Sequence, residues 1–229
     1  IHMVCEEDYL LNKNVENALK ESEALYTEIN FGNAEEMMIM QKSVQASVSL
    51  KDRISEKKYT ILKNLLNEKL ALDIATLNNL SDAGIASMLT MKSFACDDLK
   101  MYEIELLKQA MSNQKTLGGL ETIAEQMHIM EEHLNIDACI KILEEMGTSK
   151  DSNNEMVQLY KEQNIDKLLD LLNNSSYMNP QAYHDFVVKR NTNWVEKIPE
   201  IIKNKPTFFA VGAAHLGSKD GVLEMLRAK

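Results

Sequence analysis

Three short apolar segments interrupt an otherwise helical sequence pattern, and they constrain the fold more than any other feature. Residues 24–29, 116–120 and 207–212 are apolar runs of strand length, and Pro206 directly precedes the last of them. The stretches between them carry apolar residues at helical spacing. Few strands separated by many helices indicate the α/β class, with a small β-sheet surrounded by helices.

Helices are expected to dominate because helix-breaking residues are scarce. The 229 residues include only 8 glycines and 3 prolines. Gly147 is expected to end one helix, residues 148–154 to form a loop, and Asp220 to cap the last helix. No internal repeat or long linker is visible, so we expect a single domain over residues 1–229. The predicted helices are residues 13–22, 34–48, 55–80, 98–113, 122–146, 155–173, 180–203 and 222–228.

Charge and cysteine content exclude several classes of protein. The net charge of −10 and the scattered basic residues make nucleic acid a poor partner. No apolar run reaches about 18 residues, so no transmembrane segment is expected. Cys5, Cys96 and Cys139 are odd in number and lack CxxC spacing, which favours reduced, mostly buried thiols over a disulfide framework.

Ionisable residues occur where the predicted strands end. Glu28 lies in the first apolar run, Glu121 follows the second, and His215 lies three residues beyond Gly212. His2 opens the chain, where a further strand is expected to be cut short. Ligands of open α/β sheets lie outside the carboxyl ends of the strands. Two imidazoles and two carboxylates gathered there would form a metal site suited to zinc, manganese or cobalt.

Each of these residues also has an ordinary structural explanation. A carboxylate at a strand end, such as Glu121, is often a helix N-cap or a salt-bridge partner, and a histidine after an apolar strand is often hydrogen-bonded in the core. His128 and His133 are five residues apart, which turns them about 140° from each other on a helix. Their order is not HExxH, so we expect only an exposed pair between His128 and Glu132.

Two further segments each contain a histidine next to apolar residues: VGAAHLG at residues 211–217 and IHMVCEED at residues 1–8. They resemble the signature motifs of the TraB/GumN family, which includes the pheromone-shutdown and Tiki proteins. Residues 211–217, VGAAHLG, with the apolar helix start that follows them, resemble the C-terminal GxxH motif of the family. Residues 1–8, IHMVCEED, resemble the end of its first GxxH motif, usually written GTIH. On this resemblance the chain is expected to be truncated at both ends.

The intervening sequence agrees with the family in order and spacing. Residues 24–29 resemble the strand that carries a near-invariant glutamate. The YE…GLET…Q stretch of one bacterial branch is matched by Tyr102, Glu103, residues 119–122 and Gln126. The RN..W motif is matched by Arg190, Asn191 and Trp194. The resemblance covers essentially the whole chain.

The resemblance implies a fold and a metal site. Members of the family are said to share the erythromycin-esterase/ChaN-like fold, a small mixed sheet with surrounding helices. Tiki members are metal-dependent proteases that use both GxxH histidines and the glutamate. By analogy, His2, Glu28 and His215 would converge on one cleft and hold a divalent metal (Mn, Co or Zn). A ligand in a wet cleft contributes little packing, so His215→Ala is expected to leave the fold intact while abolishing metal binding and any hydrolysis.

The resemblance also implies roles in hydrolysis of a peptide or protein substrate. On this resemblance Glu28 would be a metal ligand in the catalytic centre, and Glu121 would be the general base if it is not itself a ligand. Arg190 would contact Glu28 or Glu121, bind substrate and stabilise the oxyanion, while Asn191 would position the substrate or Arg190. Arg190 and Asn191 could instead form a buried pair that ties a helix to the sheet.

Two other classes of function are consistent with the same residues. A non-catalytic protein of the pheromone-shutdown type would bind or sequester a peptide in the same pocket without turnover. A structural domain would keep the polar residues for stability alone. Relatives often carry export signals, so the periplasm or cell envelope is the expected location, with the cytoplasm as the alternative.

Overall fold

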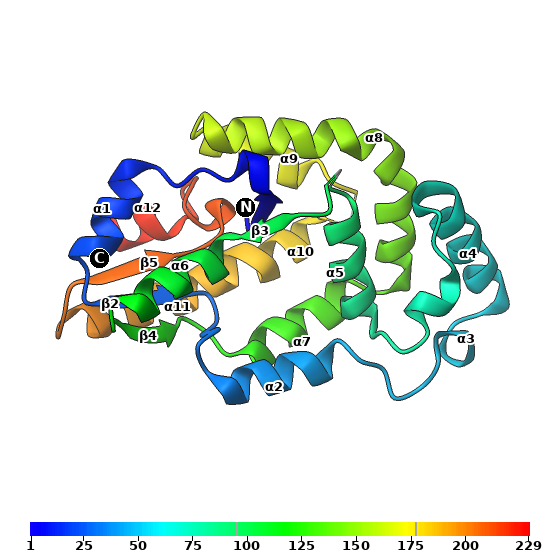
Figure 1. Cartoon of the computed structure of the whole chain (residues 1–229), viewed down its shortest axis with the longest axis horizontal. Helices are drawn as coiled ribbons and strands as arrows, with labels where there is room; N and C mark the ends of the chain where they lie inside the picture. Colours follow the sequence, from blue (N-terminus) through cyan, green and yellow to red (C-terminus); the bar gives the residue numbers. More distant parts are fainter. Residues whose placement is uncertain (95, 177) are drawn as a thin grey trace.

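A parallel three-stranded sheet forms one end of the molecule (Figure 1). The computed structural model describes residues 1–94, 96–176 and 178–229, with residues 147–152 described by their backbone alone. Strand β2 (Ala24–Thr27) is central and pairs with β4 (Thr116–Gly119) on one side and β5 (Thr207–Ala210) on the other. Thr27 aligns with both Gly119 and Ala210, so all three strands end at the same edge.

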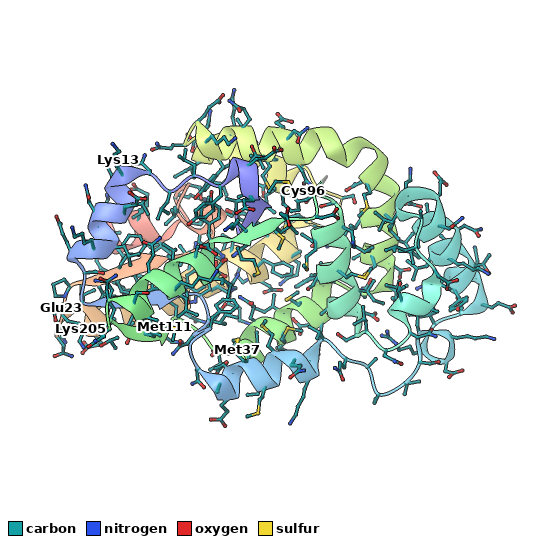
Figure 2. All side chains as sticks on the ribbon, viewed as in Figure 1. Lys13, Glu23, Met37, Cys96, Met111 and Lys205 are labelled. Carbon is teal, nitrogen blue, oxygen red and sulfur yellow. A yellow bond between two sulfur atoms is a disulfide. The ribbon has the colours of Figure 1, made fainter. Side chains whose placement is uncertain are left out.

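The opposite edge of this sheet holds the amino ends of the strands. Figure 2 shows Glu23 and Lys205 together at the left of the molecule, where β2 and β5 begin. The Lys205 ammonium donates a hydrogen bond of 2.8 Å to Oγ1 of Thr116, the first residue of β4. The strands therefore start in register, which brings the residues after them together at the far edge.

A second sheet, the β1–β3 ribbon, has only two antiparallel strands. Strand β1 (Met3–Cys5) pairs with β3 (Leu99–Met101), with Cys5 opposite Leu99. The pairing continues past β3, where the backbone N–H of Tyr102 donates to the carbonyl of His2 at 2.9 Å. One helix was predicted over residues 98–113, but Leu99–Met101 are extended because they pair with β1, and the helix begins at Tyr102.

Helices cover both faces of the parallel sheet. On one face, α1 (Lys13–Glu21) and α6 (Tyr102–Ser112) pack on a buried cluster that includes Leu25. On the other, α11 (Lys189–Ile202) and α12 (Val222–Arg227) enclose Trp194 and Leu120. Phe208 belongs to the first cluster and Phe209 to the second, as expected for successive residues of a strand.

The other end of the molecule is helical and has its own core (Figure 1). Helices α3 (Leu50–Arg53), α4 (Glu56–Leu70), α5 (Asp82–Lys92) and α8 (Ile136–Lys161) surround fully buried leucines such as Leu62 and Leu143. Helices α2 (Ala34–Ser43) and α7 (Ile123–His133) pack beside each other next to the sheet. The chain continues from α8 through α9 (Ile165–Asn173) and α10 (Pro180–Tyr183), and a π-helical turn (His184–Val188) leads into α11.

The α/β class and the predominance of helix are confirmed. Helices make up 63% of the structure, and the five strands of its described residues are divided between the parallel sheet and the β1–β3 ribbon. Within the described residues, no helix combines the length and apolar character needed to cross a bilayer.

Several predicted helix ends are wrong because local capping ends or continues the helices at other residues. The helix predicted to run to residue 146 ends at His133, because the Asn135 side chain accepts N–H bonds that start α8. Helix α8 then continues through Gly147 and the predicted loop at 148–154 to Lys161. The helix predicted to reach residue 80 ends at Leu70, followed by Ala71 with a left-handed φ of 54°.

Helix α12 does not begin as predicted either. Its N-cap is Gly221 rather than Asp220, and no side chain caps it.

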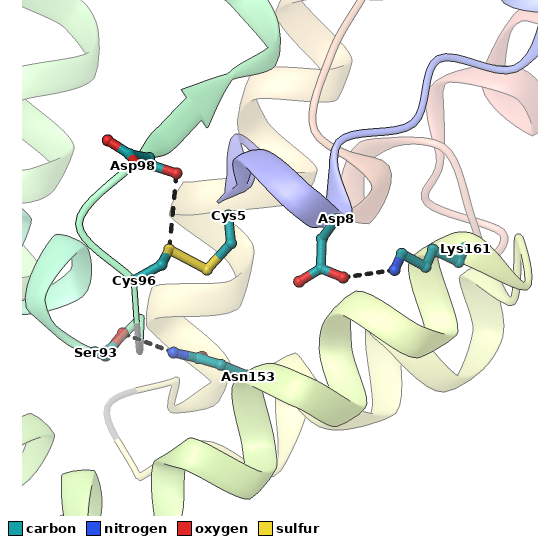
Figure 3. The surroundings of a disulfide bond; sticks show 7 residues. All are labelled: Cys5, Asp8, Ser93, Cys96, Asp98, Asn153 and Lys161. Carbon is teal, nitrogen blue, oxygen red and sulfur yellow. Dashed lines mark hydrogen bonds and ion pairs between the residues drawn. A yellow bond between two sulfur atoms is a disulfide. The ribbon is translucent and has the colours of Figure 1, made fainter.

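The prediction of reduced cysteines is wrong for two of the three. Cys5 and Cys96 form a disulfide across a sequence separation of 91 residues, with their Cα atoms 5.9 Å apart (Figure 3). The β1–β3 ribbon brings them together, because Cys5 lies opposite Leu99 and Cys96 lies three residues earlier. Cys139 is free and buried, and burial raises the pKa of its thiol to about 12.

Replacing both Cys5 and Cys96 with serine is expected to lower the free energy of unfolding by about 2–5 kcal/mol, because the bond closes a long loop. Urea unfolding with and without a reductant measures this effect. The Cys139→Ser variant is the control and should remain sensitive to the reductant. An unfolding midpoint that neither the double variant nor the reductant changes would contradict the pairing.

Candidate functional site

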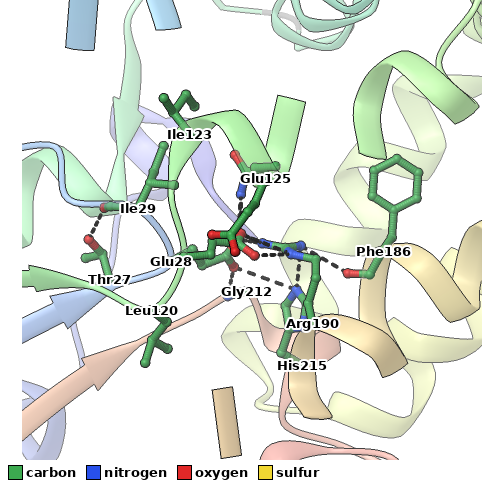
Figure 4. A network of polar contacts seen from close by, with 12 residues as sticks. Thr27, Glu28, Ile29, Leu120, Ile123, Glu125, Phe186, Arg190, Gly212 and His215 are labelled. Atoms are coloured by element: carbon green, nitrogen blue, oxygen red, sulfur yellow. Dashed lines mark hydrogen bonds and ion pairs between the residues drawn. The ribbon is translucent and has the colours of Figure 1, made fainter. Parts of the chain in front are cut away.

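The polar residues that follow the parallel strands meet at the carboxyl edge of the sheet (Figure 4). Glu28 directly follows central strand β2, and its side chain is only 5% exposed. Glu121 follows β4, and the backbone N–H of Glu121 donates to the carbonyl of Glu28 at 2.9 Å. Gly212 follows β5, and its N–H donates to Oε1 of Glu28 at 2.8 Å. Parallel register thus places two carboxylates side by side.

Arg190, in the first turn of α11, joins the two carboxylates. Its NH2 group donates to Oε2 of Glu28 and to Oε1 of Glu121, each at 2.5 Å. Its Nε lies 3.0 Å from the Glu121 carboxylate, and NH1 contacts the carbonyl of Phe186 at 3.0 Å and Nε2 of His215 at 3.1 Å. These contacts use all five N–H donors of the guanidinium.

The electrostatics of this cluster keep Glu28 ionised. Burial disfavours the charged carboxylate, but the charges of His2 and Arg190 and the N–H of Gly212 outweigh it, and they hold the pKa of Glu28 below its ordinary value. Arg190 also stacks on Trp194, with its guanidinium carbon 4.8 Å from the ring centre.

His215 lies in a 3₁₀ turn (Ala213–His215) after β5 and is neutral. Burial, with a contribution from the neighbouring Arg190, lowers its pKa to about 3. Arg190 cannot accept a proton, so its contact with Nε2 requires Nε2 to be the acceptor and Nδ1 to carry the hydrogen. Nδ1 then donates to Oδ1 of Asn191 at 2.7 Å. The imidazole also packs on Trp194, with ring centres 4.4 Å apart.

Asn191 holds His215 and does not reach the site. Its side chain is fully buried, and its amide group donates to the carbonyl of Asp220 at 2.7 Å. Its side-chain bonds go to His215 and to the backbone after it, and it meets Arg190 only through the His215 imidazole. This placement matches the buried tie between helix and sheet, and the expected role in positioning substrate or Arg190 stays a prediction.

His2 reaches the site from the β1–β3 ribbon. Its Nδ1 contacts Oε1 of Glu103 in a short hydrogen bond, and its Nε2 lies 3.9 Å from Oε1 of Glu28. Burial lowers the pKa of His2, but Glu28 and Glu103 outweigh it and raise the pKa above its ordinary value. The imidazole is half exposed, in contrast to the buried His215.

Sequence reasoning assigned no role to two residues at the site. Glu103 pairs with His2, and Gln126 donates to Glu28 at 3.3 Å and to Glu121 at 3.0 Å. Both belong to the YE…GLET…Q stretch, which was the only available signal. Glu103 and Gln126 lie in the first or second turn of a helix. A search for ionisable residues at the ends of predicted strands therefore does not find them.

The side-chain nitrogens of His2 and His215 and the carboxylate of Glu28 are donor types that suit a divalent cation. Two of the three distances between these donors also suit one ion. Nε2 of His2 and Nε2 of His215 lie 3.9 Å and 3.8 Å from Oε1 of Glu28. Ligands of one ion with bonds of roughly 2.1 Å lie at most about 4.2 Å apart. The two imidazoles are more than 4.8 Å apart, so the half-exposed His2 must move toward His215 to complete a site.

Gly212 leaves open the space between these donors. A Cβ atom at this position would lie 3.1 Å from Nε2 of His2 and 3.2 Å from Oε1 of Glu28. The donor types therefore suit a cation held by His2, Glu28 and His215, with Gly212 as the wall of the cradle, once His2 moves toward His215 and Nε2 of His215 is released from Arg190.

His128 and His133 form contacts outside this site. His128 lies 3.5 Å from Glu132 in an exposed pair, which confirms the prediction. His133 forms a hydrogen bond of 2.9 Å with Asp185. In the described residues, donor atoms of Glu132, His133 and Asp185 all lie within 4.8 Å of one another, a spacing that could hold a metal ion. Asp185 also accepts from Gln181 at 2.9 Å, so this trio is explained as a tie between α7 and the π-helical turn.

Gly212→Ala is expected to impair the site with little effect on the fold. The backbone φ of −55° suits alanine, and the Gly212 N–H bond to Glu28 is retained, so the free energy of unfolding should change by less than about 1 kcal/mol. The added methyl group would push His2 away from Glu28, so cation affinity should fall. Calorimetric titration with Mn²⁺, Co²⁺ and Zn²⁺ measures this, and unchanged affinity would contradict the cradle.

Together, the fold and the site define a helix-rich α/β protein with a buried Glu–Arg–Glu cluster between two histidines at the carboxyl edge of its parallel sheet. The TraB/PrgY/gumN family model matches residues 1–229, so the chain belongs to this family. The resemblance found in the sequence is thereby confirmed, while the bacterial branch stays a prediction. No curated protein and no solved structure matches the chain significantly.

Proposed function

We propose that this protein is a metal-dependent hydrolase that cleaves peptide bonds. The observation that carries the proposal is the position of Glu28, whose Oε1 lies 3.8–3.9 Å from an imidazole nitrogen on each side. Two imidazoles and one carboxylate are a common ligand set of catalytic zinc. Peptides are proposed as substrates because the family resemblance includes the Tiki proteases.

His2, Glu28 and His215 would hold the cation. A bound divalent cation lowers the pKa of a water ligand and polarises a carbonyl oxygen. The chain itself keeps Glu28 charged through His2 and Arg190 and keeps His215 neutral through burial, so these two donors are in the protonation states that a cation needs.

Glu121 is proposed as the general base. Its Oε2 accepts only from Nε of Arg190 within the described residues, so a lone pair remains for the proton of an attacking water. Gln126 and Arg190 hold this carboxylate beside Glu28 and fix its direction.

Arg190 is proposed to stabilise the oxyanion, although all its donors are engaged in this structure. NH1 donates to Nε2 of His215, and this nitrogen cannot accept from Arg190 and bind a cation at the same time. When His215 takes another partner, one N–H of Arg190 is released toward the site. The same arginine then serves the carboxylates and the developing negative charge.

Turnover of a peptide library with and without a chelator tests the proposal. We expect cleavage that chelation abolishes and that Mn²⁺, Co²⁺ or Zn²⁺ restores, and that the Glu121→Gln variant lacks. A protein that binds peptides tightly without cleaving any, with or without metal, would instead be a sequestering protein.

The disulfide supports the proposed location in the periplasm or cell envelope. Disulfides persist in oxidising compartments and are rare in the cytosol. Alkylation of thiols in intact cells should therefore modify neither Cys5 nor Cys96. Quantitative modification of both would favour the cytoplasm.

A further inference from the structure

Glu103 is the residue that determines how His2 is presented to the site. It lies in the first turn of α6, directly after the β1–β3 ribbon, and its side chain is 11% exposed. The residue before it, Tyr102, binds the carbonyl of His2 through its N–H at 2.9 Å, and Oε1 of Glu103 contacts Nδ1 of the same histidine. Two successive residues thus fix the backbone and the imidazole of His2.

This contact selects one tautomer of the histidine. An ionised carboxylate can only accept, so Nδ1 of His2 must carry the hydrogen. The lone pair of the neutral ring is then on Nε2, the nitrogen that faces Oε1 of Glu28 at 3.9 Å. Carboxylates that bond the second nitrogen of a metal-binding histidine fix its orientation and increase its basicity.

Stability alone does not explain a glutamate at this position. Oε2 of Glu103 is buried and has no hydrogen-bond partner within the described residues. A buried carboxylate oxygen without a partner is destabilising. The helix dipole at the amino end of α6 stabilises a negative charge on Glu103, but it does the same for Glu105. Glu105 is more exposed and pairs with Lys108 at 2.7 Å, so the dipole does not require a buried glutamate at position 103.

We propose that Glu103 is a positioning residue that locks His2 as the Nδ1–H tautomer and directs its Nε2 toward Glu28. The part of this proposal that concerns a cation rests on the proposed function, whereas the tautomer does not. Glu103 acts through His2 and touches neither substrate nor cation.

The first test is the tautomer of His2 in the metal-free protein. Long-range ¹H–¹⁵N correlation at a pH where the imidazole is neutral distinguishes a protonated from an unprotonated ring nitrogen. We expect Nδ1 to be protonated in the wild type and a mixture of tautomers in Glu103→Ala. An Nε2–H tautomer in the wild type, or the same spectrum in both proteins, would overturn the proposal.

The second test is affinity for Co²⁺, measured by its visible absorption. We expect Glu103→Ala to bind about 10–100-fold more weakly than the wild type and Glu103→Gln, which keeps an acceptor but not the charge, to be intermediate. Glu105→Gln, on the same helical turn, should bind within about twofold of the wild type. Glu103→Gln is nearly isosteric, so it carries the test if the alanine variant does not fold.

The two proposals fail in different ways. A wild-type protein that binds no cation would refute the proposed function, and the tautomer measurement would still decide the role of Glu103. A wild type that binds Co²⁺ as tightly as Glu103→Ala would refute the role of Glu103 and leave the proposed function standing.

Discussion

Replacing Arg190 with methionine is expected to lower the free energy of unfolding by about 3–5 kcal/mol, because it leaves two buried carboxylates without their cation. The side chains of Glu28 and Glu121 are 5% and 6% exposed, so water cannot replace the guanidinium. Urea unfolding measures the loss.

Combined variants show whether the loss comes from the carboxylates. Glu28→Gln together with Glu121→Gln removes both negative charges, so Arg190→Met should cost much less in that background than in the wild type. Arg190→Lys keeps the charge but has three donors in place of five, so it should fold and be intermediate in stability. If Arg190→Met lowers the free energy of unfolding equally in the wild type and in the double glutamine variant, the unpaired carboxylates are not the source of the loss.

The His215→Gln variant is expected to lose cation binding and at least about 10³-fold of peptide hydrolysis, equivalent to about 4 kcal/mol of transition-state stabilisation. The same loss is expected for His2→Gln, because both imidazoles flank Glu28. His128→Gln is the control, since this histidine is in an exposed pair with Glu132 and does not belong to the site. If His215→Gln or His2→Gln is as active as His128→Gln, the proposed role of that histidine as a metal ligand is contradicted.

Glutamine is the appropriate substitution because His215 is a packed residue. The prediction that His215→Ala preserves the fold assumes a wet cleft. That assumption is wrong, since His215 is 5% exposed, stacks on Trp194 and bonds Asn191. The alanine variant would leave a cavity and lower stability by about 2–5 kcal/mol, so unfolding of that variant alone does not argue against a metal ligand. His2 is half exposed, and His2→Ala should retain stability.

Periodicity and strand ends were enough to predict the centre of the molecule. Three apolar runs with ionisable ends predicted the parallel sheet, and parallel strands finish at one edge whatever the helices between them do. This is why Glu28, Glu121 and His215 were placed together from sequence. Arg190 could be predicted to contact the two glutamates because a buried guanidinium needs carboxylate partners.

Features that depend on short or distant pairings could not be predicted. Strands β1 and β3 have three residues each, which is too few for an alternating pattern to be distinguished from a helix. The disulfide depends on that pairing, and an odd cysteine count does not indicate which two residues meet. Glu103 was overlooked for the same reason, since only the β1–β3 ribbon brings it to His2.

The most direct test of the account is the metal content of the purified protein and of its Glu28→Gln variant. Glu28 lies between both imidazoles, so its loss should prevent a cation from binding while a near-isosteric amide preserves packing. After dialysis against Mn²⁺, Co²⁺ or Zn²⁺, elemental analysis should give one equivalent of one of these metals per chain in the wild type and none in Glu28→Gln. A wild type without bound metal, or a variant that retains a full equivalent, would contradict the proposed centre.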